Sequence, residues 1–257
     1  MIKKLTILGC GSSLGSPWLN NYWGNCNYKD KKNIRTRCCI HIQFGPISIL
    51  IDTSPDIKYQ MLKNRIKKVD AILYTHEHID QTGGIFEFRP IYFKTNTVIP
   101  IYCNKGTKQR LINTYPWLFK NTKIYPRIMK FKSTNKNIKI KKGVSNFSIS
   151  SIKVQHGNVD TRGYIFNKIA YIPDCKYISE KNFKMLKNLD YLIIDCFRPI
   201  KKTYTHLNYE ESIDLIKNLS PKKAILTNMH VDLDYKRLKE SLPKNIVPAY
   251  DNLRINF

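Results

Sequence analysis

The chain has 257 residues, with 44 lysines and arginines against 19 aspartates and glutamates, so its formal net charge is +25 at pH 7. This length is sufficient to bury a large hydrophobic core, and a hydrophobic content of 42% fits a globular protein. No apolar run approaches the ~20 residues of a membrane-spanning helix, so we expect no membrane partner.

The positive charge admits two explanations. One is a polyanionic partner such as nucleic acid. The other is an A+T-rich genome, which raises lysine together with isoleucine, asparagine, tyrosine and phenylalanine. The lysines are spread along the chain, with only modest density at residues 130–142. We therefore favour the compositional explanation and keep nucleic acid as a less favoured partner. A positive field would still attract a phosphorylated substrate.

Strand and helix patterns alternate along the first half of the chain. They predict strands at 4–9, 37–45, 47–53 and 70–76 and helices at 54–69 and 106–119. The strands at 37–45 and 47–53 form a predicted hairpin around Gly45-Pro46. Ser54 is the expected N-cap of the first helix, with Pro55 at its first position.

The second half continues in the same way. The patterns predict strands at 147–157, 163–174, 190–197 and 222–230 and helices at 208–221 and 234–243. No internal repeat, proline-rich linker or low-complexity tract interrupts the sequence. We therefore predict one mixed α/β domain over residues 1–257.

The cysteines and the first residues bear on the compartment. The seven cysteines contain no C-x-x-C pair, so we expect reduced thiols, several of them buried. The basic and apolar start of the chain is too short for a signal peptide, and we interpret it as the first strand. A cytoplasmic location is expected.

Polar residues recur where apolar strands end. Five of them occupy such places: His76, His156, Asp174, Asp195 and His230. Strand ends are where α/β proteins build their sites. The segment T-H-E-H-I-D adds His78 and Asp80 to His76, and imidazole and carboxylate ligands suit zinc, manganese or iron. A solvated loop with chance histidines is the alternative.

This segment resembles the H-x-H-x-D-H signature of the metallo-β-lactamase superfamily. Similar motifs follow over nearly the whole chain, at residues 8–17, 34–39, 154–157, 163–175, 205–216 and 224–235. Their order resembles the phosphoribosyl 1,2-cyclic phosphate phosphodiesterase-like branch. The resemblance implies an α/β fold, an αβ/βα four-layer sandwich with two mixed sheets packed face to face and helices outside.

The resemblance also implies a site with two divalent metals, zinc or manganese. The first would be held by His76, His78 and His156, and Asp174 would bridge to the second. Asp80 and His230 would complete the second site. Asp80 and His206 would be catalytic, with His206 as proton donor or phosphate contact, and water activated between the metals would attack phosphorus.

Two departures from the family pattern matter. Gln81 stands where the signature has a histidine, and a carboxamide oxygen is a weaker, harder ligand. We expect either a weak second site that includes Gln81 and favours manganese, or a site with one metal. Some members carry a cysteine cluster in the N-terminal loop, whereas the loop in this chain has Cys26 alone. We expect no structural zinc there.

Several residues have a second interpretation. His156 is also explained as a polar residue that merely ends a strand. His206 is also explained as part of a helix start that Asn208 caps. His41 alternates with apolar residues and is expected to pack against the sheet. Asp195 either orients a ligand histidine or simply ends a strand, and Asp52 is a candidate contact to a histidine.

The expected substrate contacts lie near the N-terminus. Backbone amides with Ser12 and Ser13 can cradle phosphate, unless the glycines of this loop serve only a tight turn. Arg35 and Arg37 either pair with phosphate or are solvated. His206 is a further candidate contact.

A phosphodiesterase for a small cyclic or sugar-phosphate ester is the first functional hypothesis. A tRNA 3′-processing-type ribonuclease is the alternative, although the inserted basic arm of those enzymes has no counterpart here. A mononuclear thioester or lactone hydrolase and a metal-poor binding protein remain open. A homodimer is also left open.

Overall fold

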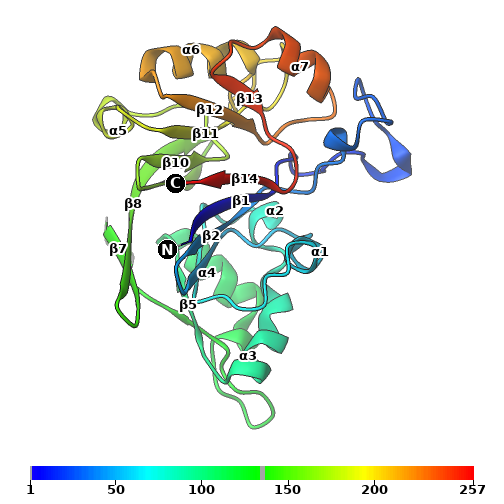
Figure 1. Ribbon diagram of the computed structural model, residues 1–257. Coiled ribbons are helices and arrows are strands. Elements are labelled where there is room, and N and C mark those ends of the chain that lie inside the picture. The colour runs from blue at the N-terminus through cyan, green and yellow to red at the C-terminus, as the bar shows by residue number, and fades with distance from the viewer. Residues whose placement is uncertain (1, 134–136) are drawn as a thin grey trace.

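The computed structural model describes residues 2–133 and 137–257. Residues 134–136 of the lysine-containing stretch therefore lie outside the described residues. Two seven-stranded sheets stack face to face, with helices on the outside (Figure 1). This arrangement confirms the expected sandwich.

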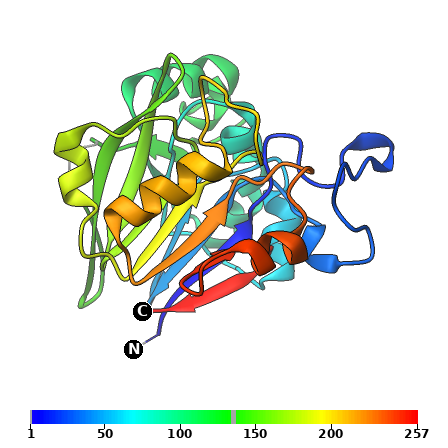
Figure 2. The ribbon, with the colours of Figure 1, turned by 90° about the horizontal axis from the view of Figure 1, so that it is seen from above.

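The first sheet combines both ends of the chain. Its strands are, in spatial order, β14 (Leu253–Asn256), β1 (Lys3–Gly9), β2 (Cys39–Phe44), β3 (Ile47–Ile51), β4 (Ala71–Leu73), β5 (Ile99–Tyr102) and β6 (Met129–Phe131). Strand β14 pairs antiparallel with β1, so the two termini lie side by side (Figure 2). Strands β3 to β6 run parallel to one another.

The second sheet is built from the second half of the chain. Its strands are β13 (Ile246–Pro248), β12 (Lys223–Thr227), β11 (Tyr191–Asp195), β10 (Ile169–Ile172), β9 (Val159–Phe166), β8 (Ser145–His156) and β7 (Asn137–Lys142). Strands β10 to β13 are parallel, so their carboxyl ends meet at one edge. This edge carries most of the candidate site.

The helices are short. Those near the first sheet are α1 (Ile57–Lys63), α2 (Ile79–Thr82), α3 (Arg89–Thr95) and α4 (Lys105–Thr114). Those over the second sheet are α5 (Glu180–Met185), α6 (Tyr209–Leu219) and α7 (Tyr235–Ser241). Single 3₁₀ turns occupy Leu19–Asn21, Lys31–Asn33, Ile85–Phe88 and Pro116–Leu118. None of the helices in the described residues has the length and hydrophobicity needed to cross a bilayer.

Alternation along the strands explains the layers. On β3, Ile49 and Ile51 belong to the core between the sheets, whereas Leu50 packs into the cluster under the helices. Successive side chains of a strand point to opposite faces, so an uninterrupted apolar strand is buried on both. All seven cysteines are buried, where several were expected to be.

Several predicted elements are shorter than expected. Helix α1 begins at Ile57 instead of 54, because Ser54 forms a turn in which its hydroxyl accepts from the Asp56 N–H. Ser54 is therefore not the N-cap. Helix α4 ends at Thr114, because Tyr115 precedes a proline and is held out of the helical region.

The predicted strand at 163–174 is a hairpin. Asn167 and Lys168 both have positive φ and turn β9 into β10. Five short strands, β5, β6, β7, β13 and β14, were not predicted. In β7, Ile138 and Ile140 face the core while lysines alternate outward. This period-2 pattern lies within the lysine-dense stretch 130–142 noted in the sequence.

His41 is a buried residue of β2, as expected of a sheet-packed histidine. Its Nε2 lies 2.8 Å from the Ser48 hydroxyl, which itself donates to the Lys68 carbonyl. The ring must therefore donate, and it is neutral. Burial, together with Lys4, lowers the pKa of His41 to about 4.

This pKa predicts an acid-sensitive contribution to stability. The unfolded chain takes up a proton near pH 6.5 and the folded chain only near 4, so stability is lost as the pH falls through this window. Between pH 7.5 and 4.5 the wild type should lose about 2 kcal/mol more free energy of unfolding than His41→Gln. Urea titrations of both proteins at the two pH values measure the difference, and equal losses would contradict the assignment.

Candidate metal centre

The H-x-H-x-D segment follows β4 and leads into α2. His76 is buried, His78 precedes the first residue of α2, and Asp80 lies inside this helix. The helix lies close against the loop that follows β3. A Cβ on Gly84 would come within 2.2 Å of the Ser54 carbonyl oxygen. Only glycine allows this close approach, which explains the glycine after the motif.

Three imidazoles converge at this point. The Nδ1 atom of His78 lies 2.8 Å from Nε2 of His76 and 3.3 Å from Nε2 of His156. His156 ends β8, so the second sheet supplies the third ring. The candidate ligand atoms of all three lie within 4.8 Å of one another.

Hydrogen bonds fix which nitrogen of each ring faces inward. Nδ1 of His156 lies 2.8 Å from the Thr205 carbonyl, an acceptor, so Nδ1 carries the proton. The Thr75 hydroxyl donates to Asp52, so it accepts from Nδ1 of His76 at 3.0 Å. Both rings therefore turn an unprotonated Nε2 towards His78.

This donor set fits a divalent cation. Two nitrogen lone pairs approach one nitrogen of His78, and a single proton there satisfies only one of them. Burial lowers the pKa of His76 well below its ordinary value and that of His156 to about 4. Neutral imidazoles are the form that binds zinc and related metals.

Asp80, Gln81 and Asp174 lie next to the imidazoles. The Gln81 amide nitrogen is 3.1 Å from Oδ2 of Asp174 and 3.4 Å from Oδ2 of Asp80. All three side chains are buried. Burial raises the pKa of both Asp80 and Asp174. Asp80 and Asp174, the carboxylates expected at a second metal, therefore lie close together, but the Gln81 amide lies between them.

His206 lies on the other side of Asp174. Its Nδ1 is 2.8 Å from Asp195 and 3.8 Å from Asp174, and its ring stacks on Phe197. Burial would lower the pKa of His206, but Asp195 and Asp174 outweigh it and raise the pKa to about 9. Asp195 therefore orients a histidine, and Asn208 caps α6 as expected.

His230 has a different environment from the one expected. Its Nε2 accepts from Arg198 at 2.9 Å, and its Nδ1 lies 2.9 Å from Asp232. Trp18 and Phe197 contact its ring. Among the described residues, the groups of three or more acidic, histidine or cysteine side chains with metal-ligand spacing include neither His230 nor Asp80.

Asn228, which the sequence patterns did not single out, takes the place facing Asp174. Its amide nitrogen lies 3.4 Å from Asp174, 3.1 Å from Asp195 and 3.2 Å from Nδ1 of His206. It follows β12 directly, whereas His230 comes two residues later. The strand-end rule would have selected Asn228 had amides been counted with charged residues.

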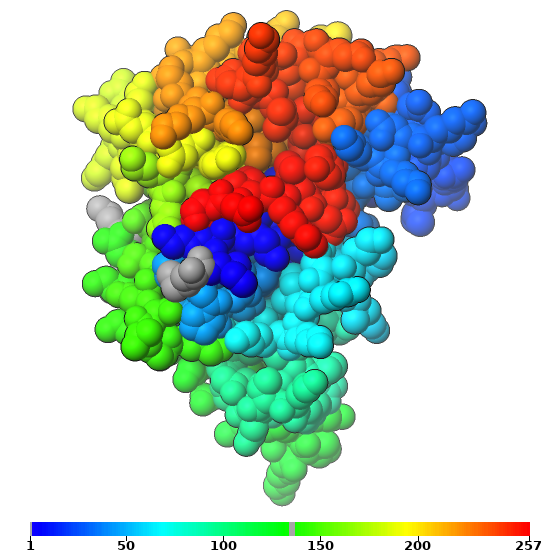
Figure 3. All heavy atoms as spheres, in the orientation of Figure 1, coloured from blue at the N-terminus to red at the C-terminus, as the bar shows by residue number. Residues whose placement is uncertain are grey.

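The glycine-rich loop and the two arginines serve internal contacts. The Ser12 amide donates to the Met229 carbonyl, Ser12 is buried and Ser13 is exposed. Arg35 is buried and donates to the Leu233 carbonyl and to Cys26. Figure 3 shows this N-terminal segment against the C-terminal part of the chain.

Arg37 is also engaged within the protein, through an ion pair with Asp56 at 3.0 Å. Gly11 lies close to Arg35, since a Cβ there would be 2.8 Å from the Arg35 carbonyl oxygen. These contacts favour the geometric explanation of the loop glycines.

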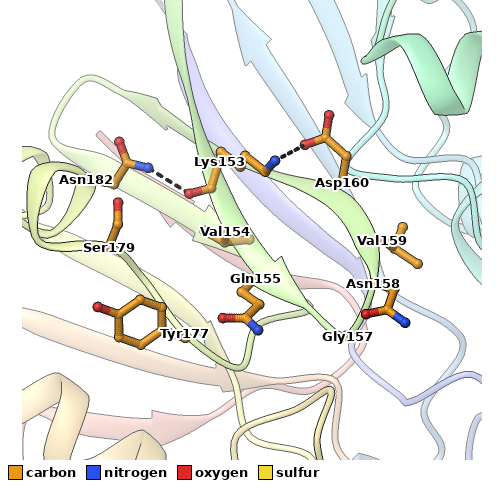
Figure 4. A pocket seen from close by; sticks show the side chains of 10 residues that line it. All are labelled: Lys153, Val154, Gln155, Gly157, Asn158, Val159, Asp160, Tyr177, Ser179 and Asn182. Carbon is orange, nitrogen blue, oxygen red and sulfur yellow. Dashed lines mark hydrogen bonds and ion pairs between the residues drawn. The ribbon is translucent and has the colours of Figure 1, made fainter.

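A separate pocket of about 430 Å³ adjoins the turn between β8 and β9. In it, Asn182 donates to the Lys153 carbonyl and Lys153 pairs with Asp160 (Figure 4). His156 lies between Gln155 and Gly157, which both line the pocket, but none of the expected ligands does. The pocket is therefore distinct from the imidazole cluster.

A family model described as a beta-lactamase superfamily domain matches residues 48–229. The chain belongs to the metallo-β-lactamase superfamily. A crystal structure described as a new diphosphatase from the PhnP family shares 30% sequence identity, with a TM-score of 0.90 over 100% of this chain and 98% of that one. This match confirms the branch that the motifs resemble.

Two further relatives extend the comparison. Zinc-bound PqqB from Methylobacterium extorquens has a TM-score of 0.75 at 17% identity, over 99% of this chain and 100% of that one, which shows the fold alone. An octanoyltransferase from Porphyromonas gingivalis is 28% identical over 253 residues, which are 97% of this chain and 51% of that protein. The chain thus spans about half the length of this curated relative.

The contact between Thr75 and His76 gives a testable prediction. Thr75→Val removes the hydroxyl that links His76 to Asp52, so we expect metal affinity to fall by about 10- to 100-fold. Thr53→Val removes another buried hydroxyl, which contacts Tyr74 and no histidine. Both variants should lose similar stability, but only the first should bind metal more weakly in a competition titration with a chelating dye. Equal affinities would contradict a role for this link.

Proposed function

We propose that this chain is a metal-dependent hydrolase of a small phosphate ester, with a phosphodiester or diphosphate linkage as the scissile group. The observation that carries the proposal is the meeting of three imidazoles with a buried carboxylate and His206 at the strand ends. The PhnP-family diphosphatase, similar over the whole chain, supports phosphate as the group attacked.

In this proposal His76, His78 and His156 hold a divalent cation. Such a cation supplies Lewis acidity, which polarises a phosphoryl oxygen and makes water more acidic. Asp80, close to these rings on α2, is the proposed acceptor of the proton that water loses. The positive net charge of the chain favours the approach of an anionic substrate.

His206 is the proposed proton donor to the leaving oxygen. Asp195 holds its Nδ1 and Phe197 holds the ring plane, so Nε2 is the nitrogen left for the substrate. Arg198 is a proposed phosphate contact, because its Nε is buried and has no hydrogen-bond partner within the described residues.

A thioester hydrolase is the second candidate. The octanoyltransferase relative favours it, as does a largely apolar pocket of about 620 Å³ lined by Phe183, Leu215 and Leu207. Cys175 also lines this pocket, and Cys175 and Leu207 directly follow Asp174 and His206.

A panel of substrates separates the candidates. Metal-loaded protein is assayed on bis(p-nitrophenyl) phosphate, a small cyclic phosphodiester, a diphosphate ester and an octanoyl thioester. We expect turnover of a phosphate substrate and its loss in His76→Ala, with the circular dichroism spectrum unchanged. Turnover of the thioester alone would replace the proposal by the second candidate. Salt-sensitive retention and cleavage of RNA would favour the nuclease instead.

The proton-donor role of His206 predicts a dependence on the leaving group. His206→Asn should lower kcat by about 10²- to 10⁴-fold for an alkyl phosphodiester, whose leaving oxygen needs a proton. The loss should be much smaller for p-nitrophenolate, which leaves without one. His41→Gln, remote from the site, serves as the control. Equal losses on both substrates would assign His206 to binding instead of proton transfer.

A further inference from the structure

Both oxygens of Asp174 face carboxamide nitrogens. Gln81 Nε2 lies 3.1 Å from Oδ2, and Asn228 Nδ2 lies 3.4 Å from Oδ1. Each amide also reaches a second carboxylate, Asp80 for Gln81 and Asp195 for Asn228. The two amides thus connect three buried acidic side chains.

A buried carboxylate must be neutralised or supplied with hydrogen bonds. An amide NH₂ group provides donors but no lone pair, so it occupies the space near a carboxylate without binding a cation. The opposite orientation of Gln81 would place its oxygen against two carboxylates, which repel it. The Gln81 oxygen makes no hydrogen bond within the described residues, so the position is used through its nitrogen.

The histidine that a second cation requires is also engaged elsewhere. Arg198 has no acceptor atom, so Nε2 of His230 is the acceptor in their contact. Nδ1 lies 2.9 Å from the Asp232 carboxylate and 3.2 Å from the Asp232 backbone N–H. Both ring nitrogens of His230 are therefore engaged within the protein. Asn228, two residues earlier, lies where such a ligand would face Asp174.

We propose that this chain binds one divalent cation, at His76, His78 and His156, and that Gln81 and Asn228 replace the second cation by donating N–H groups to Asp174 and its acidic neighbours. The inference rests on the proposed metal-dependent function and deepens it. The proposed site differs from the two-metal site that the family resemblance implies. In place of a weak second metal site, it has carboxylates that are already hydrogen-bonded to amides.

Metal content of the wild type is the primary test. Protein loaded with excess manganese and passed through a desalting column should retain one ion per chain by elemental analysis. Its electron paramagnetic resonance spectrum should be that of isolated Mn²⁺. Two ions per chain with a spin-coupled signal would overturn the inference while leaving the proposed function intact. Retention of none would overturn both.

Variants then test the carboxamides themselves. Gln81→His with Asn228→His supplies two imidazoles, and Gln81→Glu replaces the amide by a carboxylate of the same shape in case the double variant does not fold. Each folded variant should retain a second ion and show the spin-coupled signal. If folded variants retain one ion, the carboxamides are not what excludes the second, and the inference fails.

His230→Ala is the matched control. Because both ring nitrogens are already used, its removal should leave the metal content unchanged, at one ion per chain in the wild-type background and at two in Gln81→Glu. A loss of bound metal in His230→Ala would show that this histidine is a ligand, contrary to the inference.

Discussion

Three completely buried aspartates, Asp52, Asp174 and Asp195, determine how the strand ends are arranged. A carboxylate without water must find hydrogen-bond donors or positive charge nearby. Asp52 accepts from the amide and hydroxyl of Thr75, and Asp195 from the Cys175 amide, His206 and Asn228. Each acid therefore fixes a neighbour in place. These contacts orient two histidines of the site, His76 through Thr75 and His206 directly.

The same requirement explains why the two halves of the site differ. His76 and His156 turn their lone pairs inward, because their outer nitrogens donate to the Thr75 hydroxyl and to the Thr205 carbonyl. That half has a donor set that fits a cation. Around Asp174, the amides of Gln81 and Asn228 already supply donors. The chemistry of the donor set, more than the spacing of the residues, separates a metal site from a hydrogen-bonded network.

The N-terminal segment has a supporting part in this arrangement. It had been expected to bind phosphate, yet Arg35 is buried beneath it and contacts the Leu233 carbonyl, while Arg37 pairs with Asp56. Asn33 and Asn27 contact Asp234 at the start of α7. The bonds of Asn27, Asn33 and Arg35 join this segment to the residues after β12, where Asn228 and His230 lie. The loop thereby helps to position one wall of the site.

Much of this protein follows from sequence alone. A site at the strand ends is predicted by the apolar strands that end in His76, His156, Asp174 and Asp195. The order of the motifs along the chain predicts the family and its two-sheet fold. Short strands such as β5 and β13 carry too few residues for a period to be recognised. Which side chain meets Asp174 is decided by the left-handed backbone at Asn228 and by the pairing of His230 with Arg198. Such contacts join residues distant in sequence, and no local pattern specifies them. Sequence identified the three histidines proposed to hold a cation, and only the tertiary structure decided which side chains face Asp174, because those contacts join residues distant in the chain.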